Sequence, residues 1–268
     1  MHQLVMIDDF SFVDPYLLDP ITKPDKAPKN RPLLLILPGG GYRYLSPREG
    51  QPVALRANSE GFHALVLHYT VLTQKADLTL EELLAQVEFC LDWVDQNANT
   101  HHIDKTRVYI CGFSAGGHLA AWSSIRFADR LARALIVYGA VGFKKEELEA
   151  IFHFESSGQG ESRYTAEELE QGRDMIRLFE QAPAAALHAN VPPTFLFHTM
   201  DDQVVPVTQS FEYGQRLHEL NIPCELHFYC MGGHGLSLAN ASTAAHPEQD
   251  IPRIAGWFDI AVSWLKEY

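Results

Sequence analysis

A serine between two glycines follows a strongly apolar run of the chain. Residues 112–116 read Gly-Phe-Ser-Ala-Gly, after the run RVYIC at 107–111 and before a stretch rich in small residues. A sharp strand-to-helix turn at this pattern exposes the serine hydroxyl, and the N-terminus of the following helix favours a developing negative charge. The spacing therefore predicts that Ser114 is a nucleophile, the alternative being that it only caps a helix.

A nucleophilic serine requires a histidine to take its proton and a carboxylate to orient that histidine. With this kind of turn the chain order is serine, acid, histidine, so only the later of the thirteen histidines qualify. His234 fits best because it lies in a Gly-Gly-His-Gly loop directly after the apolar run ELHFYCM; the alternative is an exposed turn residue. His118, about one helical turn past Ser114, is predicted to pack or hydrogen-bond within the fold.

Two adjacent acids compete for the carboxylate role. Asp201 and Asp202 both follow the apolar run TFLFHTM, and neighbouring side chains point in different directions, so only one of them can serve. Asp202 is the predicted acid because Asp-Gln-Val-Val-Pro places it at the apex of a loop, before a proline that restarts a helix. Asp201 is assigned to solvent or to a turn hydrogen bond.

Three consecutive glycines close another apolar run. The sequence Pro-Gly-Gly-Gly-Tyr occupies residues 38–42, directly after LLLIL at 33–37. Glycines at such a place let backbone N–H groups turn toward a negatively charged oxygen, which is what an oxyanion hole requires. A flexible turn is the alternative, but the Gly-Phe-Ser-Ala-Gly motif in the same chain favours the oxyanion hole.

Short apolar runs alternate with amphipathic segments along the chain. Runs this continuous are typical of strands covered on both faces, and they lie at 33–37, 63–69, 107–113, 133–141, 194–200 and 225–231. Residues 79–96 have helical apolar spacing and open with a capping box of Thr79 and Glu82. Further helices are predicted at 115–127, 207–220 and 251–265. This alternation predicts the α/β class, with a mostly parallel, doubly wound sheet.

Residues 144–190 interrupt this alternation. They are polar and helix-prone, carry a capping box at Thr165 and Glu168, and contain no convincing strand. Such an insertion after a strand is expected over the carboxyl ends of the sheet, where open α/β folds bind ligands. No internal repeat or linker-like composition suggests a second domain, so residues 1–268 are predicted to form one domain. The proline-rich residues 19–32 are predicted to be a surface lead-in.

Composition excludes several function classes. With 21 Lys and Arg against 34 Asp and Glu, the net charge is −13, which disfavours nucleic acid and anionic membranes as partners. The four cysteines form no Cys-x-x-Cys pair and are predicted to be reduced, buried thiols. Asp8 and Asp9 stand where a signal peptide has its apolar segment, and no stretch is long enough for a membrane span, so a cytoplasmic location is expected.

Together these motifs make the chain resemble the α/β-hydrolase esterase and lipase group related to hormone-sensitive lipase, and in particular bacterial carbohydrate esterases of the acetyl xylan esterase type. The resemblance runs from Leu33 to Leu265, through PGGGY, GFSAGGHLA, HTMDDQVVP and GGHGLSL. It implies an α/β-hydrolase fold with a helical cap insertion. It also implies an oxyanion hole made of the N–H groups of Gly40, Gly41 and Ala115.

The resulting hypothesis is a serine carboxylic ester hydrolase that cleaves short acyl esters, in particular acetyl esters of sugars, through an acyl-enzyme. No metal or cofactor is expected, and the expected partner is a small ester substrate, with a homo-oligomer left open. Candidate aromatic surfaces for a sugar or aryl group, with simple packing as the alternative, are Tyr42, Tyr44, Phe152, Phe154 and Tyr164.

Three other functions fit the same scaffold. A lipase, or a peptidase of the prolyl oligopeptidase type, would use the same three residues, although such peptidases usually carry a large extra domain. A non-catalytic small-molecule receptor on an esterase scaffold would be expected to have lost its nucleophile or its base, and both are present here.

Overall fold

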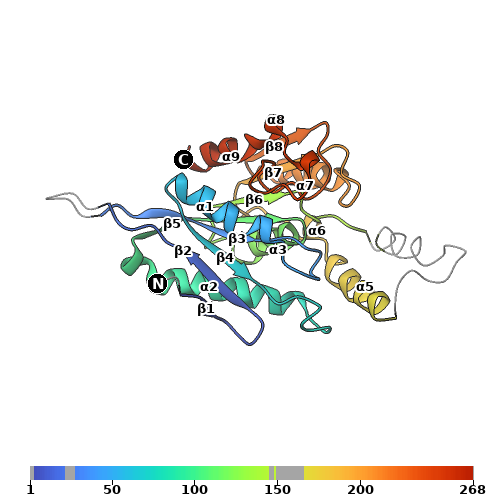
Figure 1. Cartoon of the computed structure of the whole chain (residues 1–268), viewed down its shortest axis with the longest axis horizontal. Helices are drawn as coiled ribbons and strands as arrows, with labels where there is room; N and C mark the ends of the chain where they lie inside the picture. The colour runs from blue at the N-terminus through green and yellow to red at the C-terminus, as the bar shows by residue number, and fades with distance from the viewer. Residues whose placement is uncertain (1–2, 22–27, 145–147, 149–165, 268) are drawn as a thin grey trace, which may run out of the picture.

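The apolar runs form the strands of one sheet (Figure 1). The computed structural model describes residues 3–21, 28–144, 148 and 166–267, and within these ranges the sheet has eight strands in the order β1-β2-β4-β3-β5-β6-β7-β8. Strands β3 to β8 pair in parallel, whereas β2 pairs antiparallel with both β1 and β4. Their bounds are β1 Val5–Met6, β2 Phe12–Tyr16, β3 Arg31–Leu37, β4 His63–His68, β5 Ile103–Phe113, β6 Arg133–Val137, β7 Thr194–Thr199 and β8 Cys224–Tyr229.

Helices cover both faces of this sheet. In the described part of the chain they are α1 Gln51–Ser59, α2 Leu80–His101, α3 Ala115–Arg126, α5 Ala166–Phe179, α6 Pro183–Ala186, α7 Thr208–Glu219, α8 Pro252–Ala255 and α9 Trp257–Lys266, with 3-10 turns η1 Pro47–Glu49 and η2 Pro247–Gln249. On β3, Leu33, Leu35 and Leu37 belong to the core with α2 and α3, whereas Leu34 and Ile36 belong to the core with α1 and α9. The predicted doubly wound, mostly parallel α/β sheet is confirmed.

The strands at one edge of the sheet were not predicted from sequence. Strand β2 pairs with both β1 and β4, yet its sequence FVDPY contains Asp14 and Pro15. Proline and aspartate are depleted in strands, so neither apolar continuity nor alternation reveals this one.

The helix predicted over 251–265 is two helices, α8 and α9, which meet at Gly256. Glycine is a poor helix residue, and the chain changes helix there.

The helix most strongly indicated by the sequence is confirmed. The Thr79 hydroxyl accepts a hydrogen bond from the Glu82 N–H, and the Glu82 carboxylate accepts one from the Thr79 N–H, which is the predicted capping box. The helix ends where His102 adopts φ 55°, in the left-handed region.

The described part of the predicted insertion is helical and contains no strand. Helix α5 and the short helix α6 lie within residues 144–190, whereas Thr165 of the predicted capping box lies outside the described residues, as do Phe152, Phe154 and Tyr164. Phe179, at the end of α5, packs its ring 5.2 Å from the ring of Tyr42, which follows β3. This end of α5 therefore lies at the carboxyl edge of the sheet, as expected for the insertion.

All four cysteines are free thiols, as predicted. Cys90 and Cys111 are buried, but Cys224 is half-buried and Cys230 is exposed, so the prediction of burial is wrong for the last two. Both lie at strand β8, which forms one edge of the sheet and therefore has neighbours on only one side.

Within the described ranges, no helix is both long enough and apolar enough to cross a bilayer.

Candidate active site

Ser114 occupies a strained turn between strand and helix. Strand β5 ends at Phe113, α3 begins at Ala115, and Ser114 between them has φ 53° and ψ −115°, a conformation that costs energy for a residue with a side chain. Glycine is required on both sides, because a Cβ at Gly112 would overlap the carbonyl of Gly116, and a Cβ at Gly116 would overlap the carbonyl of Leu37. This turn is the local structure that the sequence motif predicts.

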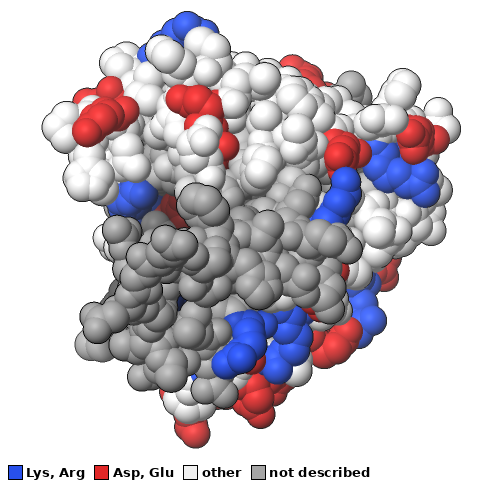
Figure 2. Space-filling view, turned by 90° about the vertical axis from the view of Figure 1, so that its right-hand side faces the viewer, with Lys and Arg blue, Asp and Glu red and all other residues white. Residues whose placement is uncertain are grey.

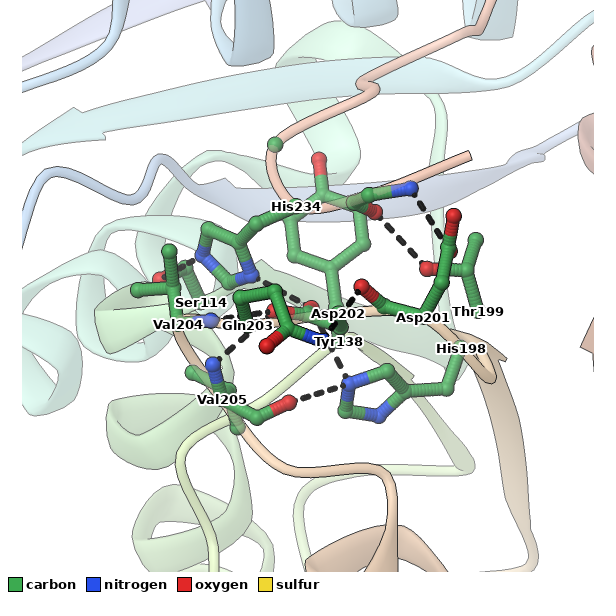
Figure 3. A network of polar contacts seen from close by, with 12 residues as sticks. Ser114, Tyr138, His198, Thr199, Asp201, Asp202, Gln203, Val204, Val205 and His234 are labelled. Atoms are coloured by element: carbon green, nitrogen blue, oxygen red, sulfur yellow. Dashed lines mark hydrogen bonds and ion pairs between the residues drawn. The ribbon is translucent and has the colours of Figure 1, made fainter. Parts of the chain in front are cut away.

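The structure brings Ser114, His234 and Asp202 together (Figure 3). His234 Nε2 lies 2.8 Å from Ser114 Oγ, and His234 Nδ1 lies 2.6 Å from Asp202 Oδ2. An ionised carboxylate can only accept, so His234 donates from Nδ1 and its Nε2 is left to accept the proton of the Ser114 hydroxyl. This is the tautomer in which the imidazole can act as a base toward the serine.

Asp202 is buried and accepts hydrogen bonds through both oxygens. Its Oδ1 accepts the N–H groups of Val204 and Val205, each at 2.9 Å, and its Oδ2 accepts from His198 Nε2 as well as from His234. Burial alone would raise the pKa of Asp202, but the hydrogen bonds from the two histidines and the backbone outweigh it and hold the pKa well below its usual range. Asp202 therefore stays ionised opposite His234.

Asp201 points away from the imidazole and supports the loop that carries it. Its carboxylate accepts the N–H groups of Gly232 at 3.2 Å and Gly233 at 2.9 Å. The Thr199 hydroxyl also donates to the Gly233 carbonyl at 2.8 Å. The loop before His234 is thus fixed to the end of β7 by both a side-chain acceptor and a side-chain donor, a role for Asp201 that sequence reasoning missed.

His198 is a second histidine on the acid that the sequence analysis did not single out. It is buried at the end of β7, where its Nδ1 accepts from the Ser210 hydroxyl at 2.7 Å and its Nε2 donates to Asp202 and to the Val205 carbonyl. The signal was present, because His198 stands four residues before Asp202 in HTMDD at the end of an apolar run.

The glycine loop at 39–41 is oriented by its own carbonyl groups. The carbonyl of Gly39 accepts from the Ser46 N–H at 2.9 Å, and that of Gly40 accepts from the Arg43 N–H at 3.0 Å. In a trans peptide the N–H of the next residue points the opposite way, so the N–H groups of Gly40 and Gly41 point away from this turn. Among the hydrogen bonds of the described residues, neither N–H is a donor.

This loop lies directly against the serine. A Cβ on Gly39 would be 2.9 Å from Ser114 Cβ. Ala115 is the first residue of α3, so its N–H has no partner within the helix. In the described structure the N–H groups of Gly40, Gly41 and Ala115 thus have no hydrogen-bond partner, and Ser114 lies against Gly39 and directly before Ala115.

His118 lies beneath the site as a buried structural residue, and its predicted packing and hydrogen bonding are confirmed. Its Nδ1 lies 2.8 Å from the Tyr42 hydroxyl and its Nε2 lies 3.0 Å from the Gln181 carbonyl. A carbonyl can only accept, so Nε2 carries the proton and Nδ1 accepts from Tyr42. Burial lowers the pKa of His118 to about 4.

Residues 18–217 of the chain match the sequence model of the BD-FAE family, which is well over half of the chain. The chain belongs to the BD-FAE family. Relatives of this BD-FAE chain include endo-1,4-beta-xylanase B of Butyrivibrio fibrisolvens, 29% identical over 219 residues (78% of this chain, 33% of that protein). The acetylxylan esterase of Xylanibacter ruminicola is 27% identical over 203 residues (74% and 40%). The chain thus spans less than two thirds of these relatives' lengths.

Solved structures resemble the whole BD-FAE chain. A sugar hydrolase, YeeB, from Lactococcus lactis is 29% identical, with a TM-score of 0.78, and the match covers 99% of this chain and 97% of that one. The carboxylesterase Cest-2923 from Lactobacillus plantarum has a TM-score of 0.81 at 24% identity, covering 100% and 96%, and shows likeness of fold. An α/β hydrolase, MGS-M1, from a deep-sea metagenome is 27% identical, with a TM-score of 0.79, covering 100% and 97%. The predicted α/β-hydrolase fold is confirmed.

The two tyrosines after the glycines have different surroundings in this BD-FAE chain. Tyr42 is fully buried, with its hydroxyl on His118, so its ring presents no surface for a substrate, which corrects the expectation for that residue. Tyr44 is 62% exposed. A Cβ on Gly41 would be 3.4 Å from Met175 Sδ of α5, so the described part of the insertion borders the glycine loop.

On the face shown in Figure 2, acidic and basic side chains are interspersed.

Proposed function

We propose that this chain is a serine carboxylic ester hydrolase that works through an acyl-enzyme. Ser114 is the nucleophile, His234 the general base and acid, and Asp202 the carboxylate that orients His234. The observation that carries the proposal is the hydrogen-bonded line from Ser114 Oγ to His234 Nε2 at 2.8 Å and from His234 Nδ1 to Asp202 Oδ2 at 2.6 Å. The strained turn at Ser114 and the unpartnered N–H groups of Gly40, Gly41 and Ala115 in the described structure further support the proposal.

Acylation begins when Ser114 Oγ forms a bond to the ester carbonyl carbon while its proton passes to His234 Nε2. The carbonyl oxygen becomes an oxyanion that accepts from the N–H groups of Gly40, Gly41 and Ala115. The tetrahedral intermediate then breaks its bond to the alcohol oxygen, and His234 returns the proton to that oxygen. Ionised Asp202 stabilises the imidazolium in between, so no proton needs to reach the carboxylate.

Deacylation repeats these steps with water in place of the serine. His234 takes a proton from water, the hydroxide oxygen bonds to the acyl carbon, and the same N–H groups hold the second oxyanion. The bond to Ser114 Oγ then breaks, and the serine receives its proton back from His234. The acid leaves, and each residue is restored to its initial state.

We further propose that the acyl group is short and that the alcohol is a sugar. The names of the acetylxylan esterase and the sugar hydrolase among the similar proteins support this proposal. Tyr44, which is exposed just after the glycine loop, is our proposed surface for stacking on a sugar ring.

A hydrolysis panel with a Ser114→Ala variant tests the proposal. The parent protein is expected to cleave p-nitrophenyl acetate and acetylated xylo-oligosaccharides and to react covalently with a fluorophosphonate probe. Ser114→Ala should lose about 10⁴-fold or more in kcat and all labelling, because the hydroxyl contributes chemistry and little packing. Ser123→Ala is the matched control, since the hydroxyl of this buried serine donates to the Leu119 carbonyl within its own helix α3.

Three outcomes would overturn the proposal. Ester hydrolysis retained by Ser114→Ala excludes this residue as the nucleophile. Faster cleavage of peptide p-nitroanilides than of esters by the parent protein would indicate a peptidase. Binding of acetylated sugars without any turnover or labelling would indicate a receptor.

A further inference from the structure

A buried carboxylate lies behind the glycine loop, and the mechanism above does not use it. Glu49, the last residue of η1, is 3% exposed. Its Oε2 accepts the N–H of Gly39 at 2.8 Å, and its Oε1 accepts the hydroxyl of Tyr138 at 2.7 Å. Glu49 thus connects the loop beside Ser114 to the residue that follows β6.

Tyr138 extends this connection to the loop that carries His234. Its hydroxyl oxygen accepts the N–H of Ser237 at 2.8 Å while donating its proton to Glu49. Its ring lies edge-on to the His234 imidazole, with ring centroids 5.0 Å apart and an interplanar angle of 64° (Figure 3). Tyr138 also has φ 38°, a rare value for a residue with a side chain, so its position is held against backbone strain.

Arg48, next to Glu49, makes a second link to the His234 loop. Its Nη2 donates to the Gly235 carbonyl at 2.8 Å, and its own carbonyl accepts the Ser237 hydroxyl at 2.6 Å. The short turn η1 is therefore bonded on one side to the glycine loop and on the other to the residues on the carboxyl side of His234.

A stability role alone is a poor reason for this carboxylate. Burying a charge costs free energy even when the charge is hydrogen-bonded, and well-packed apolar residues often replace buried ionic groups without loss of stability.

Burial first, and then the negative charge of Glu49, raise the pKa of the Tyr138 hydroxyl well above its usual value. Tyr138 therefore remains a neutral donor to Glu49.

We infer that Glu49 is a positioning residue. Through Gly39 and Tyr138 it fixes the glycine loop and the His234 loop relative to each other. The inference rests on the proposed function, because it concerns where the oxyanion donors and the base lie around Ser114. The Pro38 carbonyl of the peptide that contains the Gly39 N–H is held by the Tyr69 hydroxyl at 2.5 Å. Glu49 thus holds the other side of the same peptide, and misplacement by about 1 Å at such a site can cost on the order of 10²-fold in rate.

The test compares Glu49→Gln, Tyr138→Phe and the double variant. Glutamine keeps the volume of Glu49, but it has one acceptor oxygen, so it can accept from Gly39 or from Tyr138 but not from both. We expect each single variant to lower kcat for p-nitrophenyl acetate about 10- to 100-fold, with KM changed less than about threefold. The double variant should lose little more than the worse single variant, because both changes break one connected network.

Rates are expressed per active site, with sites counted by fluorophosphonate labelling to completion, so that unfolded protein does not contribute. Tyr109→Phe is the matched control for Tyr138→Phe. The Tyr109 hydroxyl is also buried and donates a hydrogen bond, but its acceptor is the Leu265 carbonyl of α9. Tyr109→Phe should therefore lower the melting temperature without changing kcat per active site by more than about twofold.

The inference is overturned if Glu49→Gln keeps kcat per active site within about twofold of the parent, or if Tyr109→Phe loses kcat as strongly as Tyr138→Phe. If Glu49→Gln does not fold, Tyr138→Phe decides alone, with the same threshold. The failure of the proposed function looks different, because the parent protein itself would then show neither hydrolysis nor labelling.

Discussion

His198 and His234 hydrogen-bond to the same atom, Oδ2 of Asp202, at 3.1 and 2.6 Å. The other oxygen of this carboxylate is occupied by the N–H groups of Val204 and Val205. Asp202 is thus held by four donors, two from histidines and two from its own loop, and it cannot rotate away from His234 without losing several of them. His198 consequently acts on the proposed reaction through the acid.

Replacing His198 should lower activity, because Asp202 then loses one of the hydrogen bonds that hold it. We expect His198→Leu to lower kcat/KM about tenfold or more, because a hydrogen bond to a charged group contributes about 1.5–3 kcal/mol. Loss of this donor also raises the pKa of Asp202, but the three remaining donors keep the carboxylate ionised. His198→Gln, which keeps an N–H donor near the same place, should recover part of the lost kcat/KM. A His198→Leu variant with the kcat/KM of the parent would contradict this role.

The two adjacent aspartates should respond differently to the same substitution. Asp202→Asn is expected to reduce kcat about 10⁴-fold, because the amide no longer fixes the tautomer of His234. Asp201→Asn keeps one oxygen that can accept from Gly232 or Gly233, so its kcat should fall less than about tenfold. Steady-state rates with p-nitrophenyl acetate measure both. If the two variants lose activity equally, Asp202 is not the acid that orients the base.

The free energy of unfolding should decrease at acidic pH because of His118. The unfolded chain binds a proton on this histidine near pH 6.5, whereas burial delays protonation in the folded state to about pH 4. Between these values the unfolded state binds more protons, so the free energy of unfolding decreases as pH falls, by at most about 3 kcal/mol from this group. Urea denaturation at several pH values between about 7.5 and 4.5 measures the slope.

A variant separates this contribution from other groups. His118→Gln should be less stable at neutral pH, because the bonds to Tyr42 and Gln181 are disturbed, but its stability should depend less on pH between about 6.5 and 4. It should also retain kcat per active site, whereas His234→Ala should lose about 10⁴-fold or more. An unchanged pH slope in His118→Gln would show that other groups cause the acid sensitivity.

The parts of the fold and site that sequence predicts are those encoded by neighbouring residues. The turn at Ser114 is dictated by glycines two positions away on each side, and helix α2 by its apolar spacing and the capping box at Thr79. The antiparallel strand β2 was not predicted because it contains Asp14 and Pro15, residue types that are depleted in strands. Local rules carry this information, since the determining contacts lie within a few residues of one another.

The supporting residues escape such reasoning because their partners are distant in sequence. Glu49 lies in the short polar stretch SPREG, and the Tyr138 hydroxyl that it accepts comes from a residue 89 positions away. Tyr42 and Tyr44 are two positions apart in one turn, yet one is fully buried and the other 62% exposed. Local pattern does not distinguish them, because the packing of α3 and α5 against the turn decides which ring is covered.

Acyl length distinguishes a closed pocket from a lipase-like groove. A groove gains about 0.8 kcal/mol for every CH₂ group that it buries, so rates should rise along a series of longer esters. A pocket closed behind the acyl carbon rejects added methylenes by steric overlap, and the penalty grows with each carbon. Arg173 and Asp174 come directly before Met175 in α5, and charged side chains are poor material for an acyl groove.

We therefore expect acetyl and propionyl esters to be preferred over octanoyl esters by at least ~100-fold in kcat/KM. A p-nitrophenyl ester series measures this preference, because the alcohol is then constant and only the acyl chain varies. A second series, with acetyl held constant and p-nitrophenol compared with xylose and xylo-oligosaccharides, tests the sugar separately. A rate that climbs steadily from acetyl to octanoyl would exclude the carbohydrate deacetylase while leaving Ser114, Asp202 and His234 in their proposed roles, because the hydrogen-bonded line among them does not depend on what fills the acyl pocket.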